Sequence, residues 1–141
     1  MIKGKNIVII GIQSWDIPIG SNCKNIATEL AKNNNVIYVN VPLDRKNYLK
    51  WNFTSLNDLR RLAVLKGKIS GLVKLSDTFW TFYPRTVFES INWLKNKAIF
   101  NFFNKLNAKR LAAEIERITE QLEFEDYILF NDSSMFRGEY L

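Results

Sequence analysis

The loop between Gly11 and Lys24 carries the residues of this chain that are best suited to chemistry. It holds an acidic side chain at Asp16, an indole at Trp15 that could stack on a ring, and a Gly-Ser-Asn turn that starts at Gly20. A turn of this kind before a helix presents free backbone N–H groups, which favour an anion. The loop therefore predicts a site for an anionic ligand.

Two common phosphate-binding motifs do not fit this loop. Gly11 is not followed by glycines at the spacing of a dinucleotide fingerprint, and Lys24 is neither preceded by glycine nor followed by serine or threonine. NAD is therefore not expected, and no cofactor is predicted. An ordinary connection explains the same residues equally well, with Gly20 making a bend, Asn22 capping a helix and Trp15 packed in the core.

The flanks of the loop predict the elements that would position it. Residues 6–10 and 36–41 are continuous apolar, β-branched runs, typical of strands buried on both faces of a parallel sheet. Between them, residues 23–32 place apolar side chains at helical spacing, and Ser21 or Asn22 can cap that helix. A strand, helix and parallel strand put the loop at the carboxyl edge of the sheet, where open α/β folds bind ligands.

Composition restricts the class of protein. A chain of 141 residues with 47% hydrophobic residues fits one domain, and it contains no histidine. Catalytic triads, Cys-His pairs and histidine-rich metal sites are thereby excluded, and no metal site is predicted. The lone Cys23 lies on the apolar helix face, which indicates a buried thiol in a reducing compartment. No leader or membrane-spanning run is apparent, so we expect a soluble, cytoplasmic chain.

The middle of the chain predicts further helices and a hairpin. Residues 43–53 read as a loop that leads into a helix, whose start is marked by Ser55 and Asp58 at capping-box spacing and whose end is marked by Gly67. Two short strands follow at residues 72–75 and 79–83, as a hairpin at the sheet edge. Residues 88–122 then predict a long helix, bent or broken near Asn92 or Asn101.

The last segment repeats the pattern of the first. Residues 127–130 form another apolar run typical of a buried strand, followed at once by Asn131 and Asp132. A helix from about Ser134 would have fewer than three turns before Leu141. The α/β pattern asks for at least one more strand, so we expect residues 1–141 to be one domain of a longer chain.

Several segments, taken in order, resemble the amino-terminal half of bacterial GT-B glycosyltransferases, in the group 1 and teichuronic-acid-type branch. The segments that carry the resemblance are Ser14-Trp15-Asp16, residues 20–27, residues 38–45, residues 89–93, residues 128–132 and Met135-Phe136-Arg137. The family implies two Rossmann-like domains, each a mostly parallel sheet with helices on both faces, that face each other across a cleft. The second domain holds most of the nucleotide sugar, and the first holds the acceptor.

The resemblance also implies roles for individual residues. The positions that match the family's donor-facing loop are Gly20, Ser21, Asn22 and Lys24. The positions that would complete the wall of the cleft are Asn40, Asp44, Arg45, Asn131 and Asp132. Asp16 would lie near the acceptor hydroxyl. If the reaction inverts the anomeric centre, Asp16 or Asp132 takes the acceptor proton; if it retains configuration, no base is needed here.

The implied function is transfer of a hexose from a nucleotide sugar to a glycan or lipid-linked acceptor in surface polysaccharide synthesis, with the isolated chain inactive. The net charge of +6 includes basic residues on two predicted helices. We expect these residues to form solvated helix faces or to contact an anionic membrane surface. Nucleic acid binding is not expected, because the aromatic residues lie in apolar runs. A free-standing flavodoxin-like domain that binds a phosphate or nucleotide ligand, and a scaffold module, remain alternatives.

Overall fold

The structure is a computed structural model that describes residues 1–50, 52, 54–133 and 141. Its elements alternate between strands and helices in the manner of an α/β domain. They are β1 (Asn6–Ile10), α1 (Asn22–Ala31), β2 (Asn35–Val39), α2 (Arg45–Lys50), α3 (Leu56–Leu65), β3 (Leu72–Ser76), β4 (Phe79–Phe82), α4 (Lys97–Gln121) and β5 (Ile128–Asn131).

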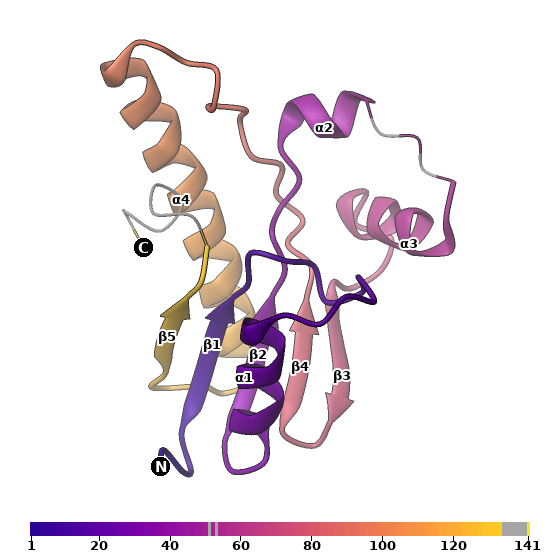
Figure 1. Ribbon diagram of the computed structural model, residues 1–141, viewed down its shortest axis with the longest axis vertical. Coiled ribbons are helices and arrows are strands. Elements are labelled where there is room, and N and C mark those ends of the chain that lie inside the picture. The colour runs from indigo at the N-terminus through magenta and orange to yellow at the C-terminus, as the bar shows by residue number, and fades with distance from the viewer. Residues whose placement is uncertain (51, 53, 134–140) are drawn as a thin grey trace.

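The strands form one sheet in the order β3-β4-β2-β1-β5. β4, β2, β1 and β5 run parallel, and β3 pairs antiparallel with β4 at one edge. The predictions of adjacent parallel strands β1 and β2, of an edge hairpin and of the last strand in the same sheet are confirmed. The carboxyl ends of the parallel strands meet at one edge, where the loop after β1 and helices α2 and α3 lie (Figure 1).

Alternate side chains of the central strands contact different helices. Val8 and Ile10 of β1 belong to a core cluster that includes Leu111 of α4. Ile7 and Ile9, on the opposite face, belong to a second cluster with Cys23 and other residues of α1. Because successive side chains of a strand point to opposite faces, these two clusters confirm a sheet covered by helices on both sides.

The predicted helix at residues 88–122 is wrong at its start. α4 begins at Lys97, where the Asn96 side chain accepts hydrogen bonds from the first turn, and it continues through Asn101 without a break. Before it, the Phe88 N–H donates to the Leu43 carbonyl at 2.8 Å and the Phe88 carbonyl accepts from the Arg45 N–H at 2.7 Å. A backbone bonded sideways to another segment cannot also form helical bonds, so this stretch is a loop.

Three smaller predictions are also corrected. Residues 45–50 form helix α2 within the segment expected to be a loop, and β2 ends at Val39 rather than at residue 41. β5 lies at the sheet edge, so its apolar side chains are 38–43% exposed instead of buried. The helix expected from about Ser134 and the Met135-Phe136-Arg137 segment lie outside the described residues. In the described part of the chain, no helix has the length and apolar character needed to span a membrane.

Gly11 is required where the loop leaves β1. A Cβ at this position would overlap the hydroxyl of Tyr38, which is fully buried in β2. We expect Gly11→Ala to lower the free energy of unfolding by about 1–3 kcal/mol, the usual cost of overpacking, as measured by urea denaturation. Gly20→Ala is the matched control, because its Cβ would meet nothing within 4 Å. Equal stability of the two variants would contradict this explanation.

Candidate functional site

A groove lies at the carboxyl edge of the sheet, between the loop after β1 and the start of α3. It has a volume of about 250 Å³ and is lined by Ser14, Asp16, Ile17, Pro18, Ser55, Asp58, Arg61 and Tyr83. We call it the Asp16 groove. A neighbouring hollow of about 160 Å³ shares Ser14 and Arg61 with it and extends along the end of β2. Of the candidate site residues predicted from the sequence, only Asp16 lines this groove.

The Asp16 carboxylate is oriented by Tyr83, which follows directly after β4. The Tyr83 hydroxyl donates a short hydrogen bond to Oδ2 of Asp16. Burial, followed by this hydrogen bond, raises the pKa of Tyr83, so the hydroxyl keeps its proton and remains a donor. A carboxylate accepts several hydrogen bonds, so Asp16 keeps capacity to accept another from a ligand.

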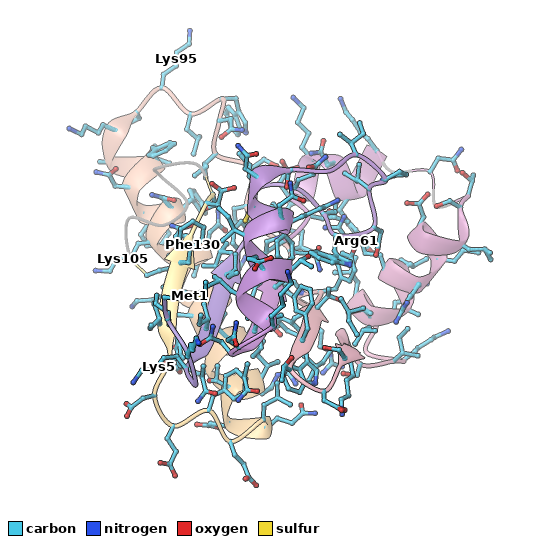
Figure 2. All side chains as sticks on the ribbon, turned by 60° about the horizontal axis from the view of Figure 1, so that its bottom comes forward. Met1, Lys5, Arg61, Lys95, Lys105 and Phe130 are labelled. Carbon is cyan, nitrogen blue, oxygen red and sulfur yellow. The ribbon has the colours of Figure 1, made fainter. Side chains whose placement is uncertain are left out.

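Arg61 of α3 places a fixed cation in the same groove. Its Nη2 donates to the Val41 carbonyl at 2.6 Å, and its guanidinium carbon lies 5.3 Å from the centre of the Tyr83 ring. Burial lowers the pKa of Arg61, yet a guanidinium remains charged at physiological pH. Figure 2 shows Arg61 on the α3 side of the molecule, away from Phe130 of β5. The groove therefore combines a carboxylate, a hydroxyl donor and a cation.

Arg61 and Tyr83 were not among the site residues predicted from the sequence. Tyr83 is the last residue of the strand predicted at residues 79–83. That strand was predicted as part of a hairpin, and its parallel pairing with β2, which puts Tyr83 at the carboxyl edge, comes from the structure. The sequence offered less indication for Arg61, because its hydrogen bond is to the carbonyl of Val41, twenty residues earlier in the chain.

Asn40 holds the loop to the sheet instead of facing a ligand. Its side chain is fully buried, with Oδ1 accepting from the Trp15 N–H at 2.6 Å and Nδ2 donating to the Phe82 carbonyl at 3.0 Å. The Trp15 ring packs edge-on against Tyr38 and Phe79, at 5.1 and 5.0 Å between centres. Trp15 is thus part of the core, as the alternative interpretation of the loop expected.

The four positions that the resemblance assigns to the donor lie together at the start of α1, but the Lys24 side chain turns inward. Ser21 is the N-cap, its Oγ accepting from the Lys24 N–H, and Asn22 is the first helical residue. The Lys24 ammonium is buried and donates to the Ile17 and Ile19 carbonyls at 2.6 and 3.2 Å. It therefore fixes the loop, while Gly20 lies in open space.

Asp132, the other candidate base, lies against Cys23. Its backbone N–H donates to the Ile10 carbonyl at 2.9 Å. Burial, with a smaller contribution from Asp132, raises the pKa of Cys23 to about 11, which keeps this buried thiol protonated. The neighbouring Asn131 side chain accepts from Ser133 at 3.0 and 2.6 Å. Neither Asn131 nor Asp132 lines the Asp16 groove.

Arg45 belongs to an ion-pair network with Glu89 and Arg110. Its guanidinium donates to both carboxylate oxygens of Glu89, at 2.8 and 2.7 Å, and Arg110 of α4 donates to the same group at 3.0 Å. These hydrogen bonds, chiefly that of Arg45, lower the pKa of Glu89 to about 2. Arg45 therefore joins two loops and does not line the Asp16 groove.

No cluster of three or more potential metal ligands among histidine, cysteine, aspartate and glutamate is found in the described residues. Comparison of the chain with models of protein families, with curated proteins and with solved structures finds no significant match.

Proposed function

We propose that this chain is the acceptor-side, Rossmann-like domain of a GT-B glycosyltransferase, which moves a hexose from a nucleotide sugar to a glycan or lipid-linked acceptor. The observation that carries the proposal is the position of Asp16, held by Tyr83 beside Arg61 in a groove at the carboxyl edge of a mostly parallel sheet. The sequence resemblance supplies the reaction, and the groove supplies a place for the acceptor.

In the proposed reaction Asp16 acts as the base. It takes the proton from an acceptor hydroxyl while that oxygen bonds to the anomeric carbon of the sugar. The bond from this carbon to the donor phosphate breaks, and the nucleoside diphosphate leaves with inversion. Tyr83 fixes the direction of the carboxylate, and Arg61, which lines the same groove, attracts the phosphates of a lipid-linked acceptor. We prefer Asp16 to Asp132 because Asp16 lines the groove.

The nucleotide requires a second domain in this proposal. The backbone N–H groups at the start of α1, near Gly20, Ser21 and Asn22, would face the donor diphosphate. The nucleoside would be bound by the second domain. Precise positioning of two reactants contributes about 7–11 kcal/mol to catalysis. The proposal therefore assigns no turnover to the 141-residue chain alone. A lipid-linked acceptor would bring this basic domain to an anionic membrane surface.

Binding of an anion to the chain itself tests this proposal. We expect inorganic pyrophosphate to shift the side-chain NMR signals of Arg61, which lines the Asp16 groove. Arg61→Met should weaken this binding at least about tenfold, since charge-assisted hydrogen bonds contribute about 1.5–3 kcal/mol.

Arg60→Met is the matched control, because Arg60 is the neighbouring residue of α3 and is exposed. Its affinity for pyrophosphate should stay close to that of the unchanged chain. Arg61→Lys, which keeps the positive charge, separates a loss of binding from a loss of folding, and thermal unfolding is followed for all three variants. Equal weakening by Arg61→Met and Arg60→Met would contradict the proposal.

A further inference from the structure

A second hollow lies between the loop that leads into α2 and the loop that precedes α4. Its volume is about 390 Å³. Its polar and aromatic lining residues are Asp44, Lys46, Asn47, Ser90, Asn92 and Trp93. We call it the Trp93 hollow. We propose that it binds a pyranose ring of a saccharide, with the Trp93 indole as the stacking surface and the carboxylate and amides as partners for the sugar hydroxyls.

The walls of the Trp93 hollow are fixed by bonds between the two loops. Besides the two backbone bonds between Phe88 and the 43–45 segment, the Lys46 N–H donates to Oγ of Ser90 at 2.9 Å. The ion pair of Arg45 with Glu89 joins the same two segments. A site whose walls are in place before the ligand arrives spends less free energy on ordering.

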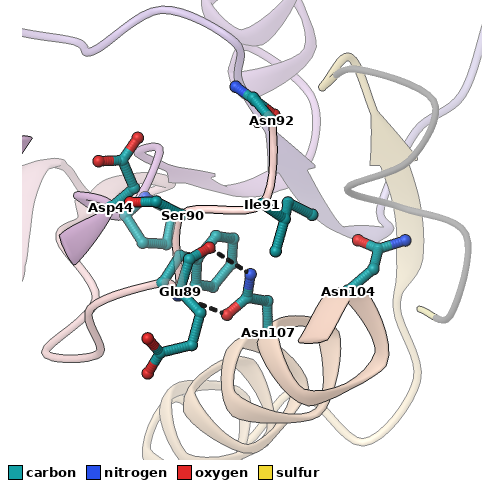
Figure 3. A pocket seen from close by; sticks show the side chains of 9 residues that line it. Asp44, Glu89, Ser90, Ile91, Asn92, Asn104 and Asn107 are labelled. Carbon is teal, nitrogen blue, oxygen red and sulfur yellow. Dashed lines mark hydrogen bonds between the residues drawn. The ribbon is translucent and has the colours of Figure 1, made fainter. Parts of the chain in front are cut away.

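Helix α4 supports the loop that carries Ser90, Asn92 and Trp93. Asn107 is 4% exposed, and its side chain accepts from the Glu89 N–H at 2.8 Å and donates to the Glu89 carbonyl at 3.0 Å (Figure 3). These paired bonds fix the backbone of Glu89, immediately before Ser90. The side chains that line the hollow therefore start from a rigid loop.

The lining has the chemistry that sugars need. Trp93 is 67% exposed, so its indole is accessible to a ligand in the hollow. The face of an indole is electronegative, and the C–H bonds on one face of a pyranose carry partial positive charge. Asp44 is a hydrogen-bond acceptor, and Asn47 and Asn92 each carry both donors and acceptors, so neighbouring hydroxyls can be bound in both directions.

The Asp44 carboxylate is already oriented for this task. The backbone and side-chain N–H groups of Asn47 donate to its two oxygens, at 2.7 and 3.2 Å. A narrow cavity of about 20 Å³ opens beside Asp44, Ser90 and Asn92 and reaches the buried Asn104 of α4 (Figure 3). This space admits one water-sized group, such as a sugar hydroxyl.

Other ligands suit the Trp93 hollow less well. A phosphate would meet the negative charge of Asp44 with Lys46 as the lining cation, and a lipid chain would bury the polar side chains without partners. A saccharide satisfies the polar groups and covers the indole at the same time.

The hollows form a row along the carboxyl edge of the sheet. The hollow of about 160 Å³ shares Asp44 and Asn47 with the Trp93 hollow, and it shares Ser14 and Arg61 with the Asp16 groove. A saccharide bound over Trp93 would therefore extend toward Asp16. Its assignment as part of the acceptor rests on the proposed function, whereas its binding does not.

The test is an NMR titration of the 141-residue chain with methyl glucoside, methyl galactoside, methyl mannoside, N-acetylglucosamine and glucuronic acid. The chain has four tryptophans, and the indole N–H signal of Trp93 is identified by its loss in Trp93→Phe. We expect at least one probe to shift this signal saturably. Trp93→Ala should weaken binding about tenfold, and Trp93→Phe should retain most of it.

Phe102→Ala is the matched control, because Phe102 is an aromatic side chain of α4 that is 65% exposed and does not line the hollow. The proposal is overturned if no saccharide, added up to its solubility limit, shifts the Trp93 signal. It is also overturned if Trp93→Ala and Phe102→Ala weaken binding equally. Saccharide binding without an effect of Arg61 on pyrophosphate would instead contradict the proposed function alone. Loss of saccharide binding with the Arg61 effect intact would contradict this inference alone.

Discussion

Replacing Asn40 with alanine is expected to lower the free energy of unfolding by about 2–4 kcal/mol, the combined cost of an unsatisfied buried polar group and a small cavity. Asn40 is fully buried, and its side chain joins the Trp15 N–H of the loop to the Phe82 carbonyl of β4. The substitution removes both bonds and frees the loop that carries Asp16. Urea denaturation measures the loss.

Asn33→Ala is the control for this prediction. Asn33 is exposed in the turn before β2, so its replacement should change stability by no more than about 0.5 kcal/mol. Asn40→Asp keeps an acceptor for the Trp15 N–H but loses the donor to the Phe82 carbonyl. Its free energy of unfolding should therefore be lower than that of Asn33→Ala. If Asn40→Ala is as stable as Asn33→Ala, the loop is not anchored by this side chain.

The strands and helices with strong local patterns were predictable. Residues 6–10 form β1 because a continuous apolar run suits a strand buried on both faces, and α1 follows from its apolar face and the Ser21 cap. The capping box of Ser55 and Asp58 likewise marks the start of α3. Each of these signals lies within a few residues of the element that it defines.

The wrong predictions concern segments whose structure depends on contacts with residues distant in the sequence. Residues 88–96 have helix-compatible apolar spacing, but Phe88 bonds to the loop after β2, so α4 starts only at Lys97. The apolar run of β5 predicted burial, yet burial depends on what covers the strand, and in the described chain only β1 pairs with it.

The candidate site shows the same division. Asp16 could be selected from the sequence because it follows a buried strand. Its partner Tyr83 follows β4 and its neighbour Arg61 lies in α3, and only the folded chain brings them together. Conversely, Lys24 had the right position for an anion, but its ammonium is taken up by the Ile17 and Ile19 carbonyls.

In the two-domain glycosyltransferase proposed above, Asp16→Asn is expected to lower the rate of sugar transfer by about 10²–10⁴-fold, the usual contribution of a general base. Asparagine has nearly the same shape and can still accept the hydrogen bond from Tyr83, but it does not take a proton from the acceptor. The fold should therefore be retained while kcat falls. Thermal unfolding of the variant checks that the domain remains intact.

The most direct test of the account is the rate of transfer by Asp16→Asn measured beside Asp77→Asn. Asp77 lies in the exposed turn of the β3–β4 hairpin, where its carboxylate pairs with Lys74 at the surface. The account predicts that Asp77→Asn transfers sugar at the rate of the unchanged enzyme and that Asp16→Asn is slower by at least about a hundredfold. Equal rates for the two variants, with both folded, would show that the Asp16 groove does not supply the base.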